Sequence, residues 1–538
     1  MHRKTKKSIA FLLTLLTVMS LTACGGNVPD DYVEGKSAGK ELEQTAAADD
    51  VFTLNCSKKN SMNPLVATNS NNQLVCDLVY ENMVELDNNY NVIPNIITDW
   101  ETENGSYWTF KVNTNRTFHN GGKLTAKDVA YSIQCACSSA RFKQRLSYVY
   151  GASALDDTTV VVSLSKKNMM FPALLTIPVV KYGTNSEDHP DGTGPYAFAK
   201  DYNSLVAFDK YPNADTLPVD VIYLAEYTDT DETILAFQDS VIDVVMNDPT
   251  SSTNIGYGSA NEIRVFNTTN LHYIGFNTMS DEFKYEALRF AMNFAFDRAY
   301  LVNTLLGGNG IETELMVSPA CKYYDESYAK QLKYDLNKCQ EILSNIGLED
   351  VDKDGYLELK MGNAVTEIDI NFVVCRANGA KMKLAEKFVE EMTSIGLKVT
   401  LNAYSWSAYK KVLDAGNYDM YYAEARINPD FDPSKFLTFG GSLNKGFFQD
   451  ENLEDAIAQF LQADDENRMV ACQNMCAMIA NKSYVVPLCF ERHQLVTHRG
   501  VIEGIKVNEN NPFYNVQNWT ITIKNVVEDQ NESVKGES

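Results

Sequence analysis

Short alternations of apolar and polar residues occur in several parts of the chain and predict β-strands. They occupy residues 51–55, 108–112 and 160–164. A period of two places every second side chain on the same face of a strand, so each segment is expected to have one covered face. A further strand is expected at residues 398–401.

Two longer stretches predict α-helices. Apolar residues recur every three or four positions in residues 286–306 and 381–395, and Gly307 and Gly396 follow these runs. Glycine after the last apolar position is typical of a helix end. The second helix directly precedes the strand expected at residues 398–401, and this alternation predicts an α/β fold with covered sheets.

The first 24 residues have the layout of a secretory signal. Four basic residues precede an apolar run over residues 9–18, and that run is too short to span a bilayer as a helix. The sequence Leu21-Thr22-Ala23-Cys24 that follows resembles the bacterial lipobox. The resemblance implies that residues 1–23 are removed and that Cys24 carries a diacylglycerol. The alternative is an ordinary signal with a structural cysteine nearby.

Both ends of the remaining chain are expected to lie outside the folded domains. Residues 24–50 are mostly small and polar, which predicts a flexible tether between the anchor and the first domain. Residues 526–538 are largely polar and charged, and they predict a disordered tail. Folded domains are therefore expected from residue 51 to about residue 525.

The length and the net charge of the chain indicate how many domains it has and which binding partners are excluded. The 538-residue chain is 44% hydrophobic and has a formal net charge of −24, and removal of the signal would make it more acidic. Its length suits two or three domains. An acidic chain without a cluster of lysine and arginine residues argues against a nucleic-acid partner.

The cysteines form two close pairs that a metal ion could bridge. Cys135 and Cys137 are two residues apart, and Cys472 and Cys476 lie one helical turn apart within a predicted helix. No histidine and no Cys-x-x-Cys pair accompanies them, so we interpret them as small buried apolar residues. We expect no metal site and no cofactor.

A series of short blocks follows in order between residues 61 and 488. The most specific is Phe118-His119-Asn120-Gly121-Gly122, with residues 124–132 directly after it. Other blocks are residues 61–65, 78–84, 92–95, 108–112, 192–196, 274–277, 295–298, 334–338, 418–420 and 486–488. In this order the blocks resemble the bacterial extracellular solute-binding proteins of family 5, the oligopeptide, dipeptide and nickel class.

The resemblance implies an α/β, two-lobed periplasmic-binding-protein-like fold (type II, large peptide-binding class). Lobe I would comprise residues 51–269, with an extra subdomain at about residues 60–181, and the return segment 489–525. Lobe II would comprise residues 270–488. Closure of the two lobes about a hinge would bury a ligand in the cleft between them.

Ligand-binding residues of lobe I follow from the same resemblance. The segment that begins with Thr68, Asn69 and Ser70 matches the part of relatives whose backbone pairs with bound peptide. Such pairing gives affinity without recognition of side chains. Asn247, after an expected strand, and Tyr273, at the crossing between the lobes, are further candidates.

Lobe II would supply charged groups. In peptide-binding relatives, a Gly-Trp…Asp…Asp-Pro segment holds the carboxylate that binds the ligand's α-amino group. Here Glu424 and Ala425 replace Gly-Trp, and the aspartate falls on Asn428 or Asp430. Glu424, Arg426 and Asp430 nevertheless gather charge after an expected strand, as a zwitterion-binding site would. A surface loop with solvated charges is the alternative.

Two other functions receive less support. The sequence has none of the glycine, serine or histidine motifs of hydrolases, zinc proteases and nucleotide-binding enzymes, so we expect no enzyme activity. Residues 350–355 have the spacing and the glycine of a calcium-binding loop. Because Met361 stands where that loop needs a bidentate glutamate, we favour a simple turn over a calcium site.

Together these features predict a monomeric receptor, anchored by its lipid to the extracytoplasmic face of the cell membrane. It would capture a small peptide and deliver it to the permease subunits of an ABC importer. A non-peptide solute such as a metal chelate, an opine or a sugar, or a role as a ligand sensor, is the alternative.

Overall fold

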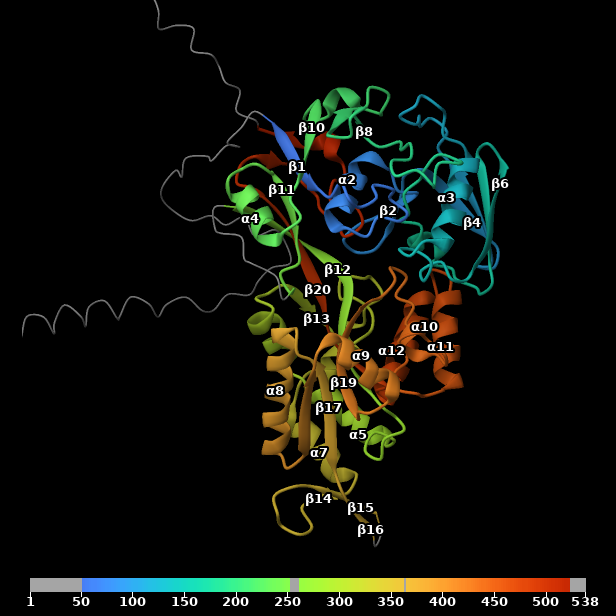
Figure 1. Cartoon of the computed structure of the whole chain (residues 1–538). Helices are drawn as coiled ribbons and strands as arrows, with labels where there is room; N and C mark the ends of the chain where they lie inside the picture. The colour runs from blue at the N-terminus through green and yellow to red at the C-terminus, as the bar shows by residue number, and fades with distance from the viewer. Residues whose placement is uncertain (1–50, 252–260, 362–363, 523–538) are drawn as a thin grey trace, which may run out of the picture. The chain divides into compact units, whose positions relative to one another are not determined.

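The computed structural model describes residues 51–251, 261–361 and 364–522 (Figure 1). The predicted signal peptide, the lipidated Cys24, the tether and the tail lie outside these residues. They stay predictions.

The largest sheet in the described part of the chain has eleven strands (Figure 1). Two neighbouring antiparallel strands, β12 (Asn261–Phe276) and β20 (Val485–His498), are its longest members. From one edge to the other the order is β18 (Lys398–Tyr404), β17 (Asp369–Cys375), β19 (Met420–Arg426), β12, β20, β11 (Val244–Asn247), β1 (Phe52–Cys56), β10 (Val221–Glu226), β9 (Ser204–Ala207) and β8 (Tyr196–Phe198), and β13 (Gly310–Glu312) pairs with β20.

Buried apolar side chains form two large hydrophobic clusters. The members of one come from residues 52–266 and 495–519, and the members of the other from residues 271–490. Between the two sets, β12 contributes four polar residues at 267–270, and β20 contributes four polar residues at 491–494. The pairing of β12 with β20 is irregular between Asn267 and Leu271. Two separately packed halves are therefore joined by a polar stretch of two paired strands.

The half that contains β1 also carries a four-stranded antiparallel sheet. Its order is β4 (Ile97–Thr102), β5 (Tyr107–Val112), β7 (Thr159–Leu164) and β6 (Val149–Asp156), and helix α3 (Ala126–Ser138) packs against β6. The other elements of this half are α2 (Ser70–Val79), α4 (Thr230–Gln238), the pairs β2 (Val84–Leu86) with β3 (Val92–Pro94) and β21 (Ile502–Glu503) with β22 (Thr520–Ile521), and the 3-10 turns Phe171–Leu174, Ala214–Thr216 and Val516–Asn518.

The other half is richer in helices. Helix α8 (Gly379–Ser394) packs on β17 and β18, and α11 (Glu451–Gln462) packs on α12 (Arg468–Lys482). The remaining elements are α5 (Glu286–Ala291), α6 (Glu326–Ala329), α7 (Leu336–Asn345), α9 (Trp406–Ala415), α10 (Ser434–Leu437), the 3-10 turns Met292–Phe294 and Lys330–Leu332, the π-helical turn Tyr300–Leu305, and a small sheet of β14 (Leu348–Glu349), β15 (Glu358–Met361) and β16 (Ala364–Glu367).

Most of the elements predicted from periodicity are confirmed. The four predicted strands are β1, β5, β7 and β18, and the helix predicted at residues 381–395 is α8. The continuous helix predicted at residues 286–306 is wrong, because α5 ends at Ala291 and irregular turns follow it. The buried guanidinium of Arg298 donates to the backbone carbonyls of Asn293, Thr313 and Pro487. In a continuous helix, the carbonyl of Asn293 would instead accept a backbone N–H of the next turn.

Candidate functional site

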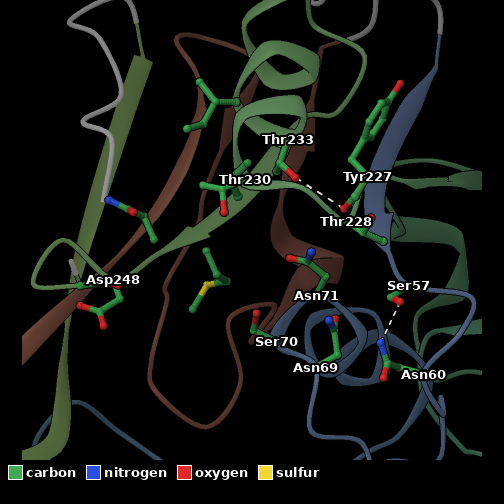
Figure 2. A pocket seen from close by; sticks show the side chains of 15 residues that line it. Ser57, Asn60, Asn69, Ser70, Asn71, Tyr227, Thr228, Thr230, Thr233 and Asp248 are labelled. Atoms are coloured by element: carbon green, nitrogen blue, oxygen red, sulfur yellow. Dashed lines mark hydrogen bonds between the residues drawn. The ribbon is translucent and has the colours of Figure 1, made fainter. Parts of the chain in front are cut away.

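A cavity of about 450 Å³ lies where β1 and β11 end and where α2 and α4 begin (Figure 2). Side-chain amides and hydroxyls dominate its wall. The lining residues are Ser57, Asn60, Asn69, Ser70, Asn71, Tyr227, Thr228, Thr230, Thr233, Ile234, Val245, Met246, Asn247, Asp248 and Ser251. The volume lies within the range of about 300–1,000 Å³ that is usual for small-molecule sites.

Local hydrogen bonds hold the α2 side of the cavity in place. Asn69 caps the helix, since its Oδ1 accepts the backbone N–H of Asn72 at 3.1 Å. The amide of Asn72 is fully buried and exchanges hydrogen bonds of 2.7 and 2.9 Å with the backbone of Ser57. The start of α2 is therefore fastened to the end of β1. Ser70 and Asn71, in the first turn, line the cavity.

The opposite side is built by α4 and by the turn after β11 (Figure 2). Asp229 caps α4 and accepts the backbone N–H groups of Asp231 and Glu232. Asp248 Oδ1 accepts both the backbone N–H and the hydroxyl of Thr250, at 2.9 and 2.7 Å. These short-range hydrogen bonds hold the start of α4 and the turn after β11 in place. Both segments are remote from α2 in the sequence.

Three of the predicted lobe I residues lie at this cavity. Asn69, Ser70 and Asn247 line it, and Asn247 also donates from its amide to Gln494 Oε1 at 2.9 Å. Thr68 is exposed and precedes the lining residues. Tyr273 is 2% exposed and packs edge-on against Tyr421 and Phe436 in a hydrophobic cluster. The structure thus places Tyr273 in a core rather than at the cavity.

Sequence reasoning missed the lining residues that follow Tyr227 and Asn247, including Thr228, Thr230 and Asp248. A usable signal was present for α4, because an aspartate directly before a threonine-rich turn is typical of a helix start. No comparable signal marks Asp248. It reaches the cavity through the pairing of β11 with β1 and β20, which joins distant parts of the chain.

A network of charged side chains occupies the polar stretch between the two clusters. His272 is fully buried, its Nε2 lies 2.5 Å from Glu491 Oε1, and its Nδ1 lies 2.9 Å from the Tyr422 hydroxyl. Glu491 also accepts the amide of Asn270, and its Oε1 lies 2.9 Å from the hydroxyl of Thr250, whose single hydrogen is shared with Asp248. Polar groups from two segments, β12 and the turn after β11, therefore converge on one carboxylate.

These donors determine the charge state of Glu491. Burial acts to raise the pKa of its carboxyl, but the hydrogen bond from His272, the nearby ring of His493 and the hydrogen bond from Asn270 outweigh burial and hold the pKa well below its ordinary value. The carboxylate is therefore negative at neutral pH. Glu424, at the end of β19, is adjacent: its Oε2 lies 3.3 Å from His272 Nε2 and 2.7 Å from Lys381 Nζ.

Two sets of side chains in this network, which share Glu491, have the atom types of a metal site. The ligand atoms of Asp248, Glu491 and His493 lie within 4.8 Å of one another, as do those of His272, Glu424 and Glu491. In the second set the ammonium of Lys381 is in contact with Glu424, and a positive charge there disfavours a cation. The arrangement is that of an ion-pair network.

The charged residues predicted in lobe II do not converge on one group. Glu424 belongs to the network just described, whereas the exposed Arg426 lies 3.3 Å from Glu509. Asn428 is half-buried, and its carbonyl accepts the backbone N–H of Phe431. These residues lie outside the set that lines the cavity, so a ligand-binding role for them stays a prediction.

Asp430 is fully buried and makes a contact between the two halves of the molecule. Its Oδ2 accepts the amide of Asn168 at 2.8 Å, and the neighbouring Asp432 lies 2.8 Å from Lys166 Nζ. Burial, together with the negative charge of Asp432, raises the pKa of Asp430 from 3.8 to about 6. This carboxyl group is therefore engaged within the protein.

A carboxylate from outside the acidic loop at residues 350–355 lies beside the aspartates of that loop. Glu358, which is buried, lies with its ligand atom within 4.8 Å of those of Asp350 and Asp352. Its Oε2 also accepts the backbone N–H of Val351 at 2.7 Å. Exposed acidic groups gather in this way without an ion in many proteins. The interpretation as a turn stays a prediction.

The ten described cysteines are free thiols. Cys472 and Cys476 are buried in a hydrophobic cluster, as predicted, whereas Cys135 and Cys137 are only half-buried on α3. Burial raises the pKa of the Cys135 and Cys137 thiols, which keeps them protonated at neutral pH.

Solved structures share this architecture. The ABC transporter substrate-binding protein CtaP from Listeria monocytogenes superposes with a TM-score of 0.71 at 17% identity, over 88% of this chain and 99% of CtaP. NikZ from Campylobacter jejuni, solved in complex with Ni(L-His), gives a TM-score of 0.62 at 18% identity, over 88% and 99%. The molecule therefore has the two-lobed α/β fold of solute-binding proteins, as predicted.

The sequence identifies the family. A profile described as "Bacterial extracellular solute-binding proteins, family 5 Middle" matches residues 91–447. The chain belongs to the bacterial extracellular solute-binding proteins of family 5, which confirms the resemblance seen in the sequence blocks. It is 22% identical to the "Oligopeptide-binding protein AppA" of Bacillus subtilis, over 96% of this chain and 99% of that protein. No helix in the described residues has the length and apolarity needed to cross a membrane.

Proposed function

We propose that this protein is an extracellular receptor that captures peptides between its two lobes and delivers them to an ABC importer. The observation that carries the proposal is the cavity of about 450 Å³, whose wall consists largely of side-chain amides and hydroxyls. Such groups both donate and accept hydrogen bonds, and so they match the N–H and C=O groups of a peptide backbone.

The relatives support the same class of ligand. The Bacillus subtilis protein that aligns with nearly the whole chain is named an oligopeptide-binding protein. The family consists of binding proteins, and we infer that this chain is not an enzyme. In support, the described residues that line the cavity include no histidine or cysteine that could act as a base or nucleophile beside its hydroxyls.

The two hydrophobic clusters support the lobe boundaries that we propose. Lobe I comprises residues 51–269, including the subdomain at about 60–181, together with the return segment 489–525, and lobe II comprises residues 270–488. The polar residues 267–270 and 491–494 belong to neither cluster and form the crossing between them. Rotation about this crossing would close the lobes over a ligand. Thr68, Asn69, Ser70 and Asn247 would contact it.

We propose that the protein is tethered to its site of action. Residues 1–23 direct export, Cys24 carries the lipid on the extracytoplasmic face of the membrane, and residues 24–50 give reach to a monomeric receptor. A short flexible tether raises the local concentration of receptor at the permease.

A non-peptide solute is the second candidate. Amide and hydroxyl groups also suit a sugar, and NikZ, which shares the fold, was solved with a nickel chelate. A sensor that reports ligand to a membrane partner would use the same site.

A thermal-shift screen of the purified protein separates these candidates. A rise in the unfolding temperature with members of a diverse peptide library supports the proposal, since a ligand that binds only the folded state stabilises it. A rise with sugars, opines or metal chelates alone would keep the fold and reject the peptide. Mass spectrometry of ligand that co-purifies with the protein gives an independent answer.

A further inference from the structure

Asp248 is the only residue with a charged side chain among the described residues that line the cavity. Its side chain is 41% exposed, whereas the remaining lining residues carry amides, hydroxyls, a thioether or hydrocarbon. No lysine or arginine is in this set. A ligand in the cavity therefore meets one carboxylate and no lysine or arginine among these residues.

The other carboxylates of the region are already engaged. Glu491 accepts hydrogen bonds from His272, Thr250 and Asn270. Glu424 is paired with Lys381 at 2.7 Å. Asp248 Oδ1 receives the short turn bonds from Thr250, and the ring nitrogen Nε2 of His493 lies 3.6 Å away. That separation is too long for a hydrogen bond, so Asp248 is the carboxylate with capacity for a ligand.

Further charged side chains lie near the cavity, and most of them are acidic. The start of α4, which contributes Thr230 and Thr233 to the wall, carries the capping residue Asp229 and the first-turn residues Asp231 and Glu232. The nearby cation Lys58 follows Ser57 in sequence, and its Nζ donates to Asn203 Oδ1 at 2.6 Å, away from the lining residues. Carboxylates therefore outnumber lysines among these charged side chains.

We propose that Asp248 binds a cationic group of the ligand, an ammonium or a guanidinium, and so selects peptides that place such a group in the cavity. This inference rests on the proposed function and names the class of peptide. A charged hydrogen bond that is shielded from water on lobe closure is stronger than a neutral one. A carboxylate of the ligand at the same place would be repelled.

The test compares matched peptides by titration calorimetry with the purified full-length protein. Each pair in a peptide library differs only by lysine or norleucine at one position, and each member is made with a free and with an acetylated N-terminus. We expect lysine or free-amine members to bind about tenfold or more tightly than their neutral partners. If acetylation of the N-terminus removes the tighter binding, the group that Asp248 binds is the α-ammonium. If replacement of lysine by norleucine removes it, the group is the lysine side chain.

Two variants locate the effect. Asp248→Asn keeps an oxygen that can accept the hydrogen bonds from Thr250 and removes the charge, so the charged and neutral members of each matched pair should bind this variant with equal affinity. Asp239→Asn removes an exposed charge at the end of α4, outside the cavity, and should retain the preference.

The outcomes are distinguishable. If matched peptides bind with equal affinity, or if Asp248→Asn keeps the preference, the inference about Asp248 is wrong and the peptide receptor stands. If no peptide in the library binds, the proposed function itself fails, and this inference fails with it.

Discussion

His272 on β12 and Glu491 on β20 form a buried pair at the edge of the polar stretch that joins the two hydrophobic clusters. The ring nitrogen Nε2 of His272 lies 2.5 Å from Glu491 Oε1, and the two side chains are 0% and 2% exposed. Thr250 and Asn270 donate to the same carboxylate. One side chain thus connects the segment after β11 with both long strands, beside the polar residues that lie between the two hydrophobic clusters.

Removing the charge of Glu491 should destabilise the protein. Glu491→Gln removes the closer of the two carboxylates beside His272, and hydrogen bonds to buried charged groups contribute about 2 kcal/mol each to the free energy of unfolding. Urea unfolding measures the loss. Glu503→Gln, which removes an exposed carboxylate on β21, is the matched control and should change little.

The same pair predicts an effect of acid. Because the folded-state pKa of Glu491 lies below its ordinary value of 4.5, its contribution is present above that pH and is lost as the pH falls below it. The wild-type protein should therefore lose stability more steeply than Glu491→Gln below about pH 4.5. Parallel acid-limb curves for the two proteins would contradict the assignment.

Asp430 predicts a pH dependence of the opposite sign. Its pKa is raised to about 6 by burial and by Asp432, so the folded protein binds the proton more tightly than the unfolded chain. Its effect on stability should become unfavourable as the pH rises through about 6. Asp430→Asn should therefore gain stability relative to wild type between about pH 4 and about pH 7, as measured by urea unfolding. Asp215→Asn, at an exposed position, should show no such trend.

Gly194 should tolerate no side chain. A Cβ at this position would lie 2.6 Å from the backbone carbonyl oxygen of Leu78 and from the carbonyl carbon of Val79, which are backbone atoms that cannot rotate away. Gly194→Ala should cost about 3 kcal/mol of unfolding free energy. Gly379→Ala is the control: nothing lies within 4 Å of its Cβ at the start of α8, so the change should be neutral or stabilising.

Asn71 should contribute directly to affinity. Its side chain lines the cavity at the first turn of α2, whereas the capping bond of that helix is made by Asn69. Asn71→Ala should weaken peptide binding about tenfold through loss of a hydrogen bond, with little change in thermal stability. The exposed Asn88 provides a control outside the cavity. Equal affinities for Asn71→Ala and Asn88→Ala would argue against a ligand at α2.

Cys24 should decide where the protein resides. Cys24→Ala removes the predicted site of lipid attachment, so cell fractionation should find the protein released from the membrane with peptide affinity unchanged. Cys135→Ala, on helix α3, should stay at the membrane. Retention of the Cys24→Ala protein in the membrane fraction would show that another segment anchors the chain.

Local patterns predicted the elements well, because the strands at β1, β5 and β7 and the helix α8 each carry their periodicity within a few residues. The family was likewise readable from short blocks. The three-dimensional environment of the candidate residues could not be predicted from such local patterns. Asp430 follows a strand, as a ligand residue would, but it contacts Asn168, which lies 262 positions away in the sequence. Asp248 reaches the cavity through strand pairing, and no local pattern encodes that pairing.

The polar sequences at residues 267–270 and 491–494 have a consequence for how substitutions combine. The two hydrophobic clusters share no buried members, although Tyr90 and Met170 of the first half pack against the second cluster. A cavity made in one cluster away from these two side chains should therefore leave the packing of the other unchanged. Free-energy changes from core substitutions on opposite sides should therefore add, since distant sites without shared partners behave independently. Departures from additivity should concentrate at the few side chains, Glu491 foremost, that contact both sides.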